Sequence, residues 1–467
     1  MKNRAGATIV SVGVGTFMSA LDSGAVNLAM PLIREAFGTS LSMVEWIVTA
    51  YLLVISSLLL SFGRLADLYG HKKVYSTGFT VFIAGSLLCG ISTGIGMLIV
   101  CRVIQALGAG MLMATGPAII TNAVPPERRG KALSVTAIAV ALGTSAGPTI
   151  GGVLATLWGW KSIFFINLPV GIIGLILVHR NIPQDEKTTA VPFDIAGSVL
   201  VFFALLLFLL PLSLSGDYHI PLPAFLGSIA TGLILIACFI FLELRQEHPM
   251  LNLHFFRNRI FAASNAAAVF IYMAQFIMVF LAPFYLQNLR NYTAMFSGLI
   301  YLPMPLATMC IAPVSGAISD KFDGKYISSA GALIMAIGLF LLSFLRIDTT
   351  LWYIVLGMII TGLGFGMFQT PNNSAIMGNA PQKNRGTASG TLATMRNIGM
   401  ALGVAISGSL FSFSQDHTRS LLSAGGQTGA SLEANAFTAA LHITFIAAAI
   451  VALLAMSASL VKGKTEK

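Results

Sequence analysis

The stretch TIVSVGVGTFMSALDSGAVNLAMP, residues 8–31, decides the fold class, because it is long, apolar and interrupted by one charge, Asp22. A helix that crosses a bilayer needs about 20 mostly apolar residues, and this stretch is long enough. A carboxylate in such a segment is expensive, since the hydrocarbon core has no water to solvate it. The stretch therefore predicts a membrane span and marks Asp22 as a candidate functional residue.

The rest of the chain has the same character. Of its 467 residues 56% are hydrophobic and only 9% are charged, and the mean hydropathy is +0.84. Soluble domains carry about 25% charged residues. We therefore predict an all-α integral membrane protein with fourteen transmembrane helices. They are expected at residues 8–30, 44–63, 74–94, 97–121, 131–156, 162–179, 193–213, 222–243, 260–287, 294–318, 326–346, 351–372, 386–412 and 438–461.

The net charge of +10 reflects topology rather than a nucleic-acid partner. With the amino terminus inside the cell, most Lys and Arg residues fall on cytoplasmic segments, as the positive-inside rule requires. Both termini are therefore expected in the cytoplasm, in a multi-pass protein of the cell membrane. The exceptions are Arg34, Lys161, Arg290, Arg346 and Arg419 on external loops, and Arg102 and Arg396 within spans. The cysteines show no metal-ligand spacing, so we expect no metal site.

An internal repeat organises the chain. LGAGM (107–111) recurs 256 residues later as LGFGM (363–367), and two six-helix halves with a substrate site between them are a common transporter architecture. We predict a 6 + 2 + 6 arrangement: an N-terminal bundle at 1–183, two inserted helices at 184–255 that pack outside the central cavity, and a C-terminal bundle at 256–467. The same offset relates Arg129, Gly130, Gly143 and Gly147 to Arg385, Gly386, Gly399 and Gly403.

Several motifs carry a family resemblance. GRLADLYGHKK (63–73) resembles the signature loop of the major facilitator superfamily, and GTSAGPTIGG (143–152) is similar to the glycine-proline motif of its proton-driven antiporters. The resemblance is to the fourteen-helix drug:proton antiporters and covers nearly the whole chain. It implies the major facilitator fold and multidrug efflux, hence antibiotic resistance. Further matching stretches are LDSGAVNLAMP (21–31), RVIQALGAG (102–110), WKSIFFINLPVG (160–171) and PNNSAIM (371–377).

The two glycine motifs supply candidate gating residues. Glycines in the signature loop allow a tight turn, and Asp67 is expected to contact the start of a second-half helix around Gly386 when the protein is closed to the inside. Glycines four residues apart in the second motif leave one helix face bare for close packing. The candidate gating residues are Gly63, Asp67, Gly70, Lys72, Lys73, Gly143, Gly147, Pro148 and Gly151.

Asp22 and Arg102 form the candidate proton-coupling site. Counted from the outer face at 1.5 Å per residue, Asp22 lies about 13 Å deep and Arg102 about 8 Å deep, so the two side chains can meet. They form either a permanent ion pair that locks two helices or a proton site in which Arg102 and water access tune Asp22; the resemblance supports the second. With one clearly buried carboxylate, about one proton per cycle is the simplest stoichiometry.

Other polar residues within spans are candidates for binding substrate. Interhelical hydrogen bonding is the alternative for all the amides. Arg396 could bind an anionic part of a substrate or pin its helix. The candidates are Asn27, Gln105, Gln275, Gln369, Asn372, Asn373 and Arg396.

These observations predict a monomeric proton-coupled antiporter that exports lipophilic or cationic small molecules across the bilayer. Export of an endogenous amphiphile, such as a lipid, fatty acid or siderophore, is the alternative, and a non-transporting membrane sensor is a third. The chain contains no phosphate-cradling lysine motif, so we expect no cofactor beyond the proton gradient and no enzymatic activity. The stretch 413–437 predicts a mobile external loop or hairpin.

Overall fold

The computed structural model describes residues 2–125, 129–183, 195–214, 221–246, 253–379 and 385–462, and helices are the regular secondary structure found there. Eleven segments of these residues are helical, long and apolar enough to cross a membrane, and a shorter apolar helix lies at Ala196–Leu212. The all-α class is thus confirmed. The count of fourteen spans, the position of the termini relative to the cytoplasm and the three domain boundaries stay predictions.

The helices follow the order expected from the repeat. The first half contains α1 (Lys2–Phe37), α2 (Leu41–Tyr69), α3 (His71–Gly90), α4 (Ile95–Ala123), α5 (Arg129–Trp158), α6 (Ser162–Phe165) and α7 (Asn167–Asn181). Next come α8 (Ile195–Leu214), α9 (Leu222–Arg245) and the short η2 (Leu253–Arg257). The second half contains α10 (Arg259–Phe284), η3 (Tyr285–Leu289), α11 (Ala294–Tyr301), α12 (Pro303–Lys321), α13 (Gly324–Leu342), α14 (Leu351–Gly378), α15 (Arg385–Ala424) and α16 (Gly429–Leu460).

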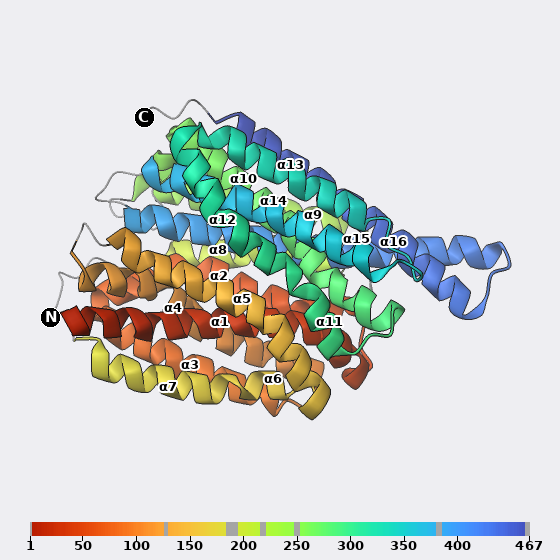
Figure 1. The fold of residues 1–467 in the computed structure, drawn as a ribbon, viewed down its shortest axis with the longest axis horizontal. Coiled ribbons are helices and arrows are strands. Elements are labelled where there is room, and N and C mark those ends of the chain that lie inside the picture. Colours follow the sequence, from red (N-terminus) through yellow and green to blue (C-terminus); the bar gives the residue numbers. More distant parts are fainter. Residues whose placement is uncertain are drawn as a thin grey trace.

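Two predicted spans differ from the structure. The span at 162–179 is divided between α6 and α7, and the span at 294–318 is divided between α11 and α12, where Pro303 has no backbone N–H to continue the ladder. Of the two forms predicted for the stretch 413–437, the structure has the hairpin, which is helical and has its turn at Gly426, with a φ of +86°. In Figure 1 this α15–α16 hairpin projects from the bundle.

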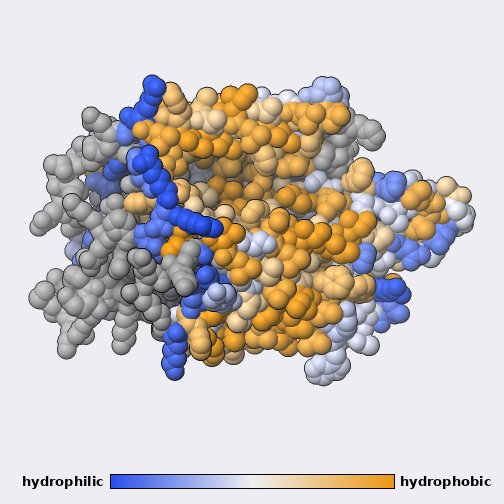
Figure 2. Space-filling model, turned by 90° about the horizontal axis from the view of Figure 1, so that it is seen from above, coloured by the Kyte–Doolittle hydropathy of each residue, from blue (hydrophilic) through white to orange (hydrophobic). Residues whose placement is uncertain are grey.

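The helices form one elongated bundle in which the start of α1 and the end of α16 lie at the same end, opposite the α15–α16 hairpin (Figure 1). Figure 2 shows a broad belt of apolar side chains across the middle of the face in view, with hydrophilic residues at its edges. Of the inserted helices, α8 packs against α2 and α15, one helix from each half, and α9 packs against α8. The belt is the surface that a lipid bilayer would cover.

In both halves, glycines allow the first and fifth helices to pack closely against each other. A Cβ added to Gly147 of α5 would lie 2.8 Å from the carbonyl oxygen of Leu21 in α1, and one added to Gly151 would lie 2.7 Å from the Cα of Ala25. In the second half a Cβ on Gly403 of α15 would lie 2.4 Å from the carbonyl oxygen of Met273 in α10. The spacing of four residues therefore places bare backbone against the partner helix, as small-residue motifs do.

The two halves touch at the end of the bundle that the sequence predicts to be external. Gln287 of η3 donates to the carbonyl oxygen of Leu28 at 2.8 Å, and Thr149 of α5 donates to that of Gly298 at 3.3 Å. Glu45 of α2 is fully buried against Gly408 of α15. These contacts close the predicted external end in this conformation.

Candidate functional site

A buried charge cluster surrounds Asp22 of α1. Arg102 of α4 donates from Nη1 to Oδ2 of Asp22 at 2.7 Å. Gln105, one turn further along α4, donates to Oδ1 at 3.0 Å, and Asn167 at the start of α7 donates to Oδ1 at 2.7 Å. Asp22 is 0% exposed and Arg102 is 1% exposed. The pair predicted from depth alone therefore meets directly, away from solvent.

A second layer of contacts orients the donors. Arg102 also donates from Nε to the carbonyl oxygen of Ile47 at 3.3 Å, and its guanidinium lies 4.0 Å from the centre of the Tyr51 ring. Ser86 of α3 accepts from Asn167 at 2.9 Å and itself donates to the carbonyl oxygen of Phe164 at 2.8 Å. Such connected networks restrict side-chain geometry, although the side-chain oxygen of Asn167 is buried without a hydrogen-bond partner.

Local sequence explains how the cluster assembles. Arg102 and Gln105 are three residues apart, so they lie on one face of α4. A Cβ on Gly85 of α3 would lie 2.6 Å from the backbone nitrogen of Gln105, so this glycine lets α3 approach α4 closely and brings Ser86 to the network. Asn167 is placed by the break between α6 and α7 at Ile166.

Sequence reasoning missed part of this site. Asn167 and Ser86 were assigned no role, although Asn167 is the polar residue of the apolar stretch FFINLPVG (164–171) and could have been noticed there. The expectation of one clearly buried carboxylate was also wrong, because Glu45 is 0% exposed and Glu243 of α9 is 3% exposed. Both lie near the ends of their helices, where hydropathy alone does not distinguish burial from contact with water.

Three of the predicted substrate-binding amides make contacts within the protein itself. Asn27 donates to Ser23 within α1 at 2.9 Å, and Gln275 of α10 contacts the sulfur of Met304 at 3.5 Å. Asn372 of α14 donates to the carbonyl oxygen of Ser264 at 3.1 Å and accepts from Lys462 at 2.5 Å. Gln105 belongs to the Asp22 cluster, and Asn373 is half-buried. Interhelical bonding, the alternative, describes Asn372 and also Gln369, since both amides of α14 donate to α10.

A second polar group lies in the other half. Gln369 of α14 donates to the hydroxyl of Tyr272 in α10 at 2.7 Å, and Phe365 packs edge-on against the Tyr272 ring at 5.2 Å. The guanidinium of Arg396 in α15 lies 5.8 Å from the centre of the same ring. Gln369 and Arg396 are both half-buried. The structure thus brings together two predicted residues, Gln369 and Arg396, around a tyrosine that the sequence analysis did not identify.

The signature loop forms the expected turn between α2 and α3. Gly70 has a φ of +95°, which favours glycine. Asp67, 52% exposed at its side chain, lies 3.5 Å from His71, while Lys72 donates to the carbonyl oxygen of His179 at 3.1 Å. The side-chain surroundings of Gly386 lie outside the described residues, so its contact with Asp67 stays a prediction.

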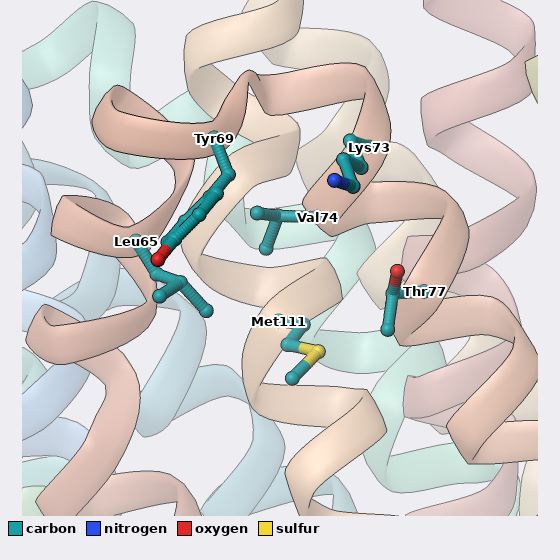
Figure 3. A pocket seen from close by; sticks show the side chains of 6 residues that line it. All are labelled: Leu65, Tyr69, Lys73, Val74, Thr77 and Met111. Carbon is teal, nitrogen blue, oxygen red and sulfur yellow. The ribbon is translucent and has the colours of Figure 1, made fainter.

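A small pocket adjoins this loop (Figure 3). Its polar residues are Tyr69 of α2, Lys73 and Thr77 of α3, and the amine of Lys73 lies 5.8 Å from the centre of the Tyr69 ring. Gly63 has open space around its Cα. The remaining lining residues are Leu65, Val74 and Met111. The pocket lies at the end of the bundle that holds the chain termini, far from the Asp22 cluster.

The fold and a charge cluster in an apolar bundle define the class: a multi-pass membrane transporter. Residues 12–404 match the Major Facilitator Superfamily, and the chain belongs to that family. It is similar to the riboflavin transporter RibZ of Clostridioides difficile (37% identity, covering 90% of this chain and 92% of RibZ) and to the multidrug transporter protein MdtP of Bacillus subtilis (33%, covering 86% and 74%).

A solved structure shows the same fold. A bacterial homologue of the human lysosomal transporter Spinster, in an inward-facing and unoccupied conformation, superposes with a TM-score of 0.70, with 98% of each chain covered. The sequence identity is 15%, so this similarity concerns the fold alone. The family match and the curated relatives, rather than this fold similarity, make the chain a transporter of the cell membrane and not an enzyme.

Proposed function

We propose that this transporter is a proton-coupled antiporter that exports an amphipathic small molecule and admits protons. The observation that carries the proposal is the Asp22–Arg102 pair, buried within the first half and held by Gln105 and Asn167. Ionisable groups inside a membrane are costly and mark proton or substrate pathways. The multidrug transporter among the similar proteins supports export of an amphipathic compound.

The cluster also suggests how coupling works. All the side-chain groups that contact Asp22 are donors, an arrangement that suits a carboxylate anion. The two halves are in contact at the predicted external end in the described conformation. Opening to the other side would expose Asp22 to external protons, and protonation would remove its attraction to Arg102. Protonation of Asp22 is then coupled to the conformational change.

A second candidate is transport of a flavin-like compound. The chain covers 92% of a protein named as a riboflavin transporter and is 37% identical to it. Export of another endogenous amphiphile remains the broader form of this alternative. In each case the transporter is proposed to act as a monomer, with one substrate pathway between its two halves.

Transport in proteoliposomes tests the proposal. An imposed pH gradient should drive a fluorescent amphiphile, such as fluorescein, rhodamine 6G or riboflavin, against its concentration gradient, and a proton ionophore should abolish this uphill flux. Flux that persists unchanged with the ionophore would contradict proton coupling. A protein that moves none of these compounds, with or without a gradient, would exclude them as its substrates.

A further inference from the structure

The second polar group lies at the depth where transporters bind substrate. At 1.5 Å per residue, Arg396 lies about 16 Å along α15 from Arg385, and Tyr272 lies about 20 Å along α10 from Arg259. Gln369 lies about 14 Å from the end of α14 at Gly378. Since the hydrocarbon core is about 30 Å thick, all three side chains are near its middle, and they come from three helices of one half.

Arg396 lacks the anion that a cation needs at this depth. Among the described residues it forms no ion pair and no hydrogen bond, and its Nε is buried without a partner; its contact is the Tyr272 ring at 5.8 Å. A guanidinium offers five donors, and leaving them unmatched away from bulk water is unfavourable. Arg102, by contrast, uses its donors on Asp22, Gln105 and the backbone.

The groups beside Arg396 are aromatic and polar. The Tyr272 ring contacts both Arg396 and Phe365, and its hydroxyl is held by Gln369. Half-burial of Arg396 and Gln369 leaves part of each side chain accessible. Aromatic side chains pack against flat rings, and a guanidinium binds a carboxylate or sulfonate through two parallel hydrogen bonds.

We propose that Arg396, Tyr272 and Gln369 form the substrate-binding site, and that the substrate class is a planar aromatic compound bearing an anionic group. The anionic group pairs with the guanidinium of Arg396, and the ring system packs on Tyr272 and Phe365. This inference rests on the proposed function as a transporter. It replaces the expectation of a cationic substrate, because Arg396 repels cations while the Asp22 charge is already neutralised by Arg102.

Binding of two xanthene dyes with opposite charge tests the charge preference. Fluorescein is an anion and rhodamine 6G is a cation on the same three-ring scaffold, and fluorescence anisotropy with purified protein in nanodiscs of zwitterionic lipid measures both affinities. We expect the wild type to bind fluorescein at least about tenfold more tightly, since hydrogen bonds to charged groups contribute that much or more. Tighter binding of rhodamine 6G, or no measurable binding of fluorescein, would overturn the proposal.

Variants assign the preference to Arg396. Arg396→Gln should weaken fluorescein binding about tenfold to a hundredfold and leave rhodamine 6G binding equal or tighter, while Arg396→Lys should lose less, because it keeps the charge but not the planar fork. The matched control is Arg245→Gln, since Arg245 of α9 is exposed and also lies against a ring, 4.0 Å from the centre of Phe241. Unchanged fluorescein affinity in folded Arg396→Gln would overturn the site.

A milder variant keeps the test valid if Arg396→Gln fails to fold. Tyr272→Phe keeps the ring and removes the hydroxyl that Gln369 contacts; it should weaken fluorescein binding a fewfold, and no change would count against the site. The proposed function is judged separately by pH-driven flux. Loss of the anion preference with intact flux removes this site alone, whereas anion binding without any pH-driven flux removes the antiport proposal.

Discussion

Two arginines lie within the membrane-spanning bundle, and their surroundings differ. Arg102 in the first half pairs with Asp22 at 2.7 Å and is 1% exposed. Arg396 in the second half is half-buried and lies over a tyrosine ring, with no ion pair or hydrogen bond to the part of the chain that the structure describes. Because the charges of Asp22 and Arg102 neutralise each other, this pair is suited to holding or releasing a proton. Arg396 has no such partner, so its positive charge is left for a ligand. Our proposals therefore place proton coupling and substrate recognition in different halves.

The internal repeat shows how this division arose in the fold. The position 256 residues after Asp22 is Met278, and the position 256 residues after Arg102 is Met358. Close packing of the first and fifth helices through glycines is present in both halves. The charged pair of Asp22 and Arg102 has no counterpart at the repeated positions. Helix packing is therefore shared by the repeats, while the buried polar groups differ between them.

Asp22→Asn should produce the largest effect. It leaves Arg102 buried without a counter-charge, and removing one partner of a buried pair costs about 3–5 kcal/mol. Uphill transport driven by a pH gradient should fall to background, and the midpoint of thermal unfolding should decrease. The control is the double variant Asp22→Asn with Arg102→Leu, which should regain stability but not transport. Proton-driven accumulation of dye by the single variant would make Asp22 structural.

Asn167→Ala should produce an intermediate effect within the same cluster. It removes one of the donors to Asp22, a loss of about 1.5–3 kcal/mol for a hydrogen bond to a charged group. The Asp22 carboxylate would then be held less firmly beside Arg102, so proton-driven uptake should slow several-fold. Asn265→Ala is the matched control, because Asn265 is equally buried but bonds to Phe261 within its own helix. An equal loss of proton-driven uptake in both variants would separate Asn167 from the proton site.

Lys462→Met should produce the smallest effect and concerns a buried cation outside the spans. Burial lowers the pKa of Lys462 to about 7, against a smaller opposing effect of Asp323. The unfolded chain therefore binds more protons than the folded one between pH 7 and the ordinary lysine value of about 10.4, so wild-type stability rises with pH across that window. Methionine removes the cost of burying a charge, so the variant should gain thermal stability relative to wild type at pH 6.

The gain of Lys462→Met should shrink towards pH 10, where wild-type Lys462 is neutral in the folded protein. Differential scanning fluorimetry across this range measures the difference in unfolding midpoint. Lys161→Met is the control, because Lys161 is exposed, and its difference from wild type should not vary with pH. A Lys462→Met difference that is constant from pH 6 to pH 10 would mean that this lysine is not held in its neutral form.

Local patterns in the sequence were sufficient for the class of fold and for one pair of residues. Length and hydropathy predicted membrane-spanning helices, the glycine spacing predicted close packing of α5, and residue depth brought Asp22 and Arg102 to similar levels. These properties depend on the helix rise and on contact with lipid, and both act on each segment separately. The sequence predicted either a mobile loop or a hairpin at 413–437. Its polar composition is compatible with both forms until the packing of α15 and α16 is known.

The partners of the buried polar groups were decided by the tertiary structure alone. Asn167 reaches Asp22 across 145 positions of the chain, and Tyr272 of α10 meets Gln369 of α14 across 97. The sequence by itself determined that Asp22, Arg102 and Arg396 lie inside the membrane. Which of the two arginines finds a carboxylate depends on how each helix is rotated and on which neighbour it faces. No local periodicity encodes that choice, because it is made by contacts between helices that are distant in the chain.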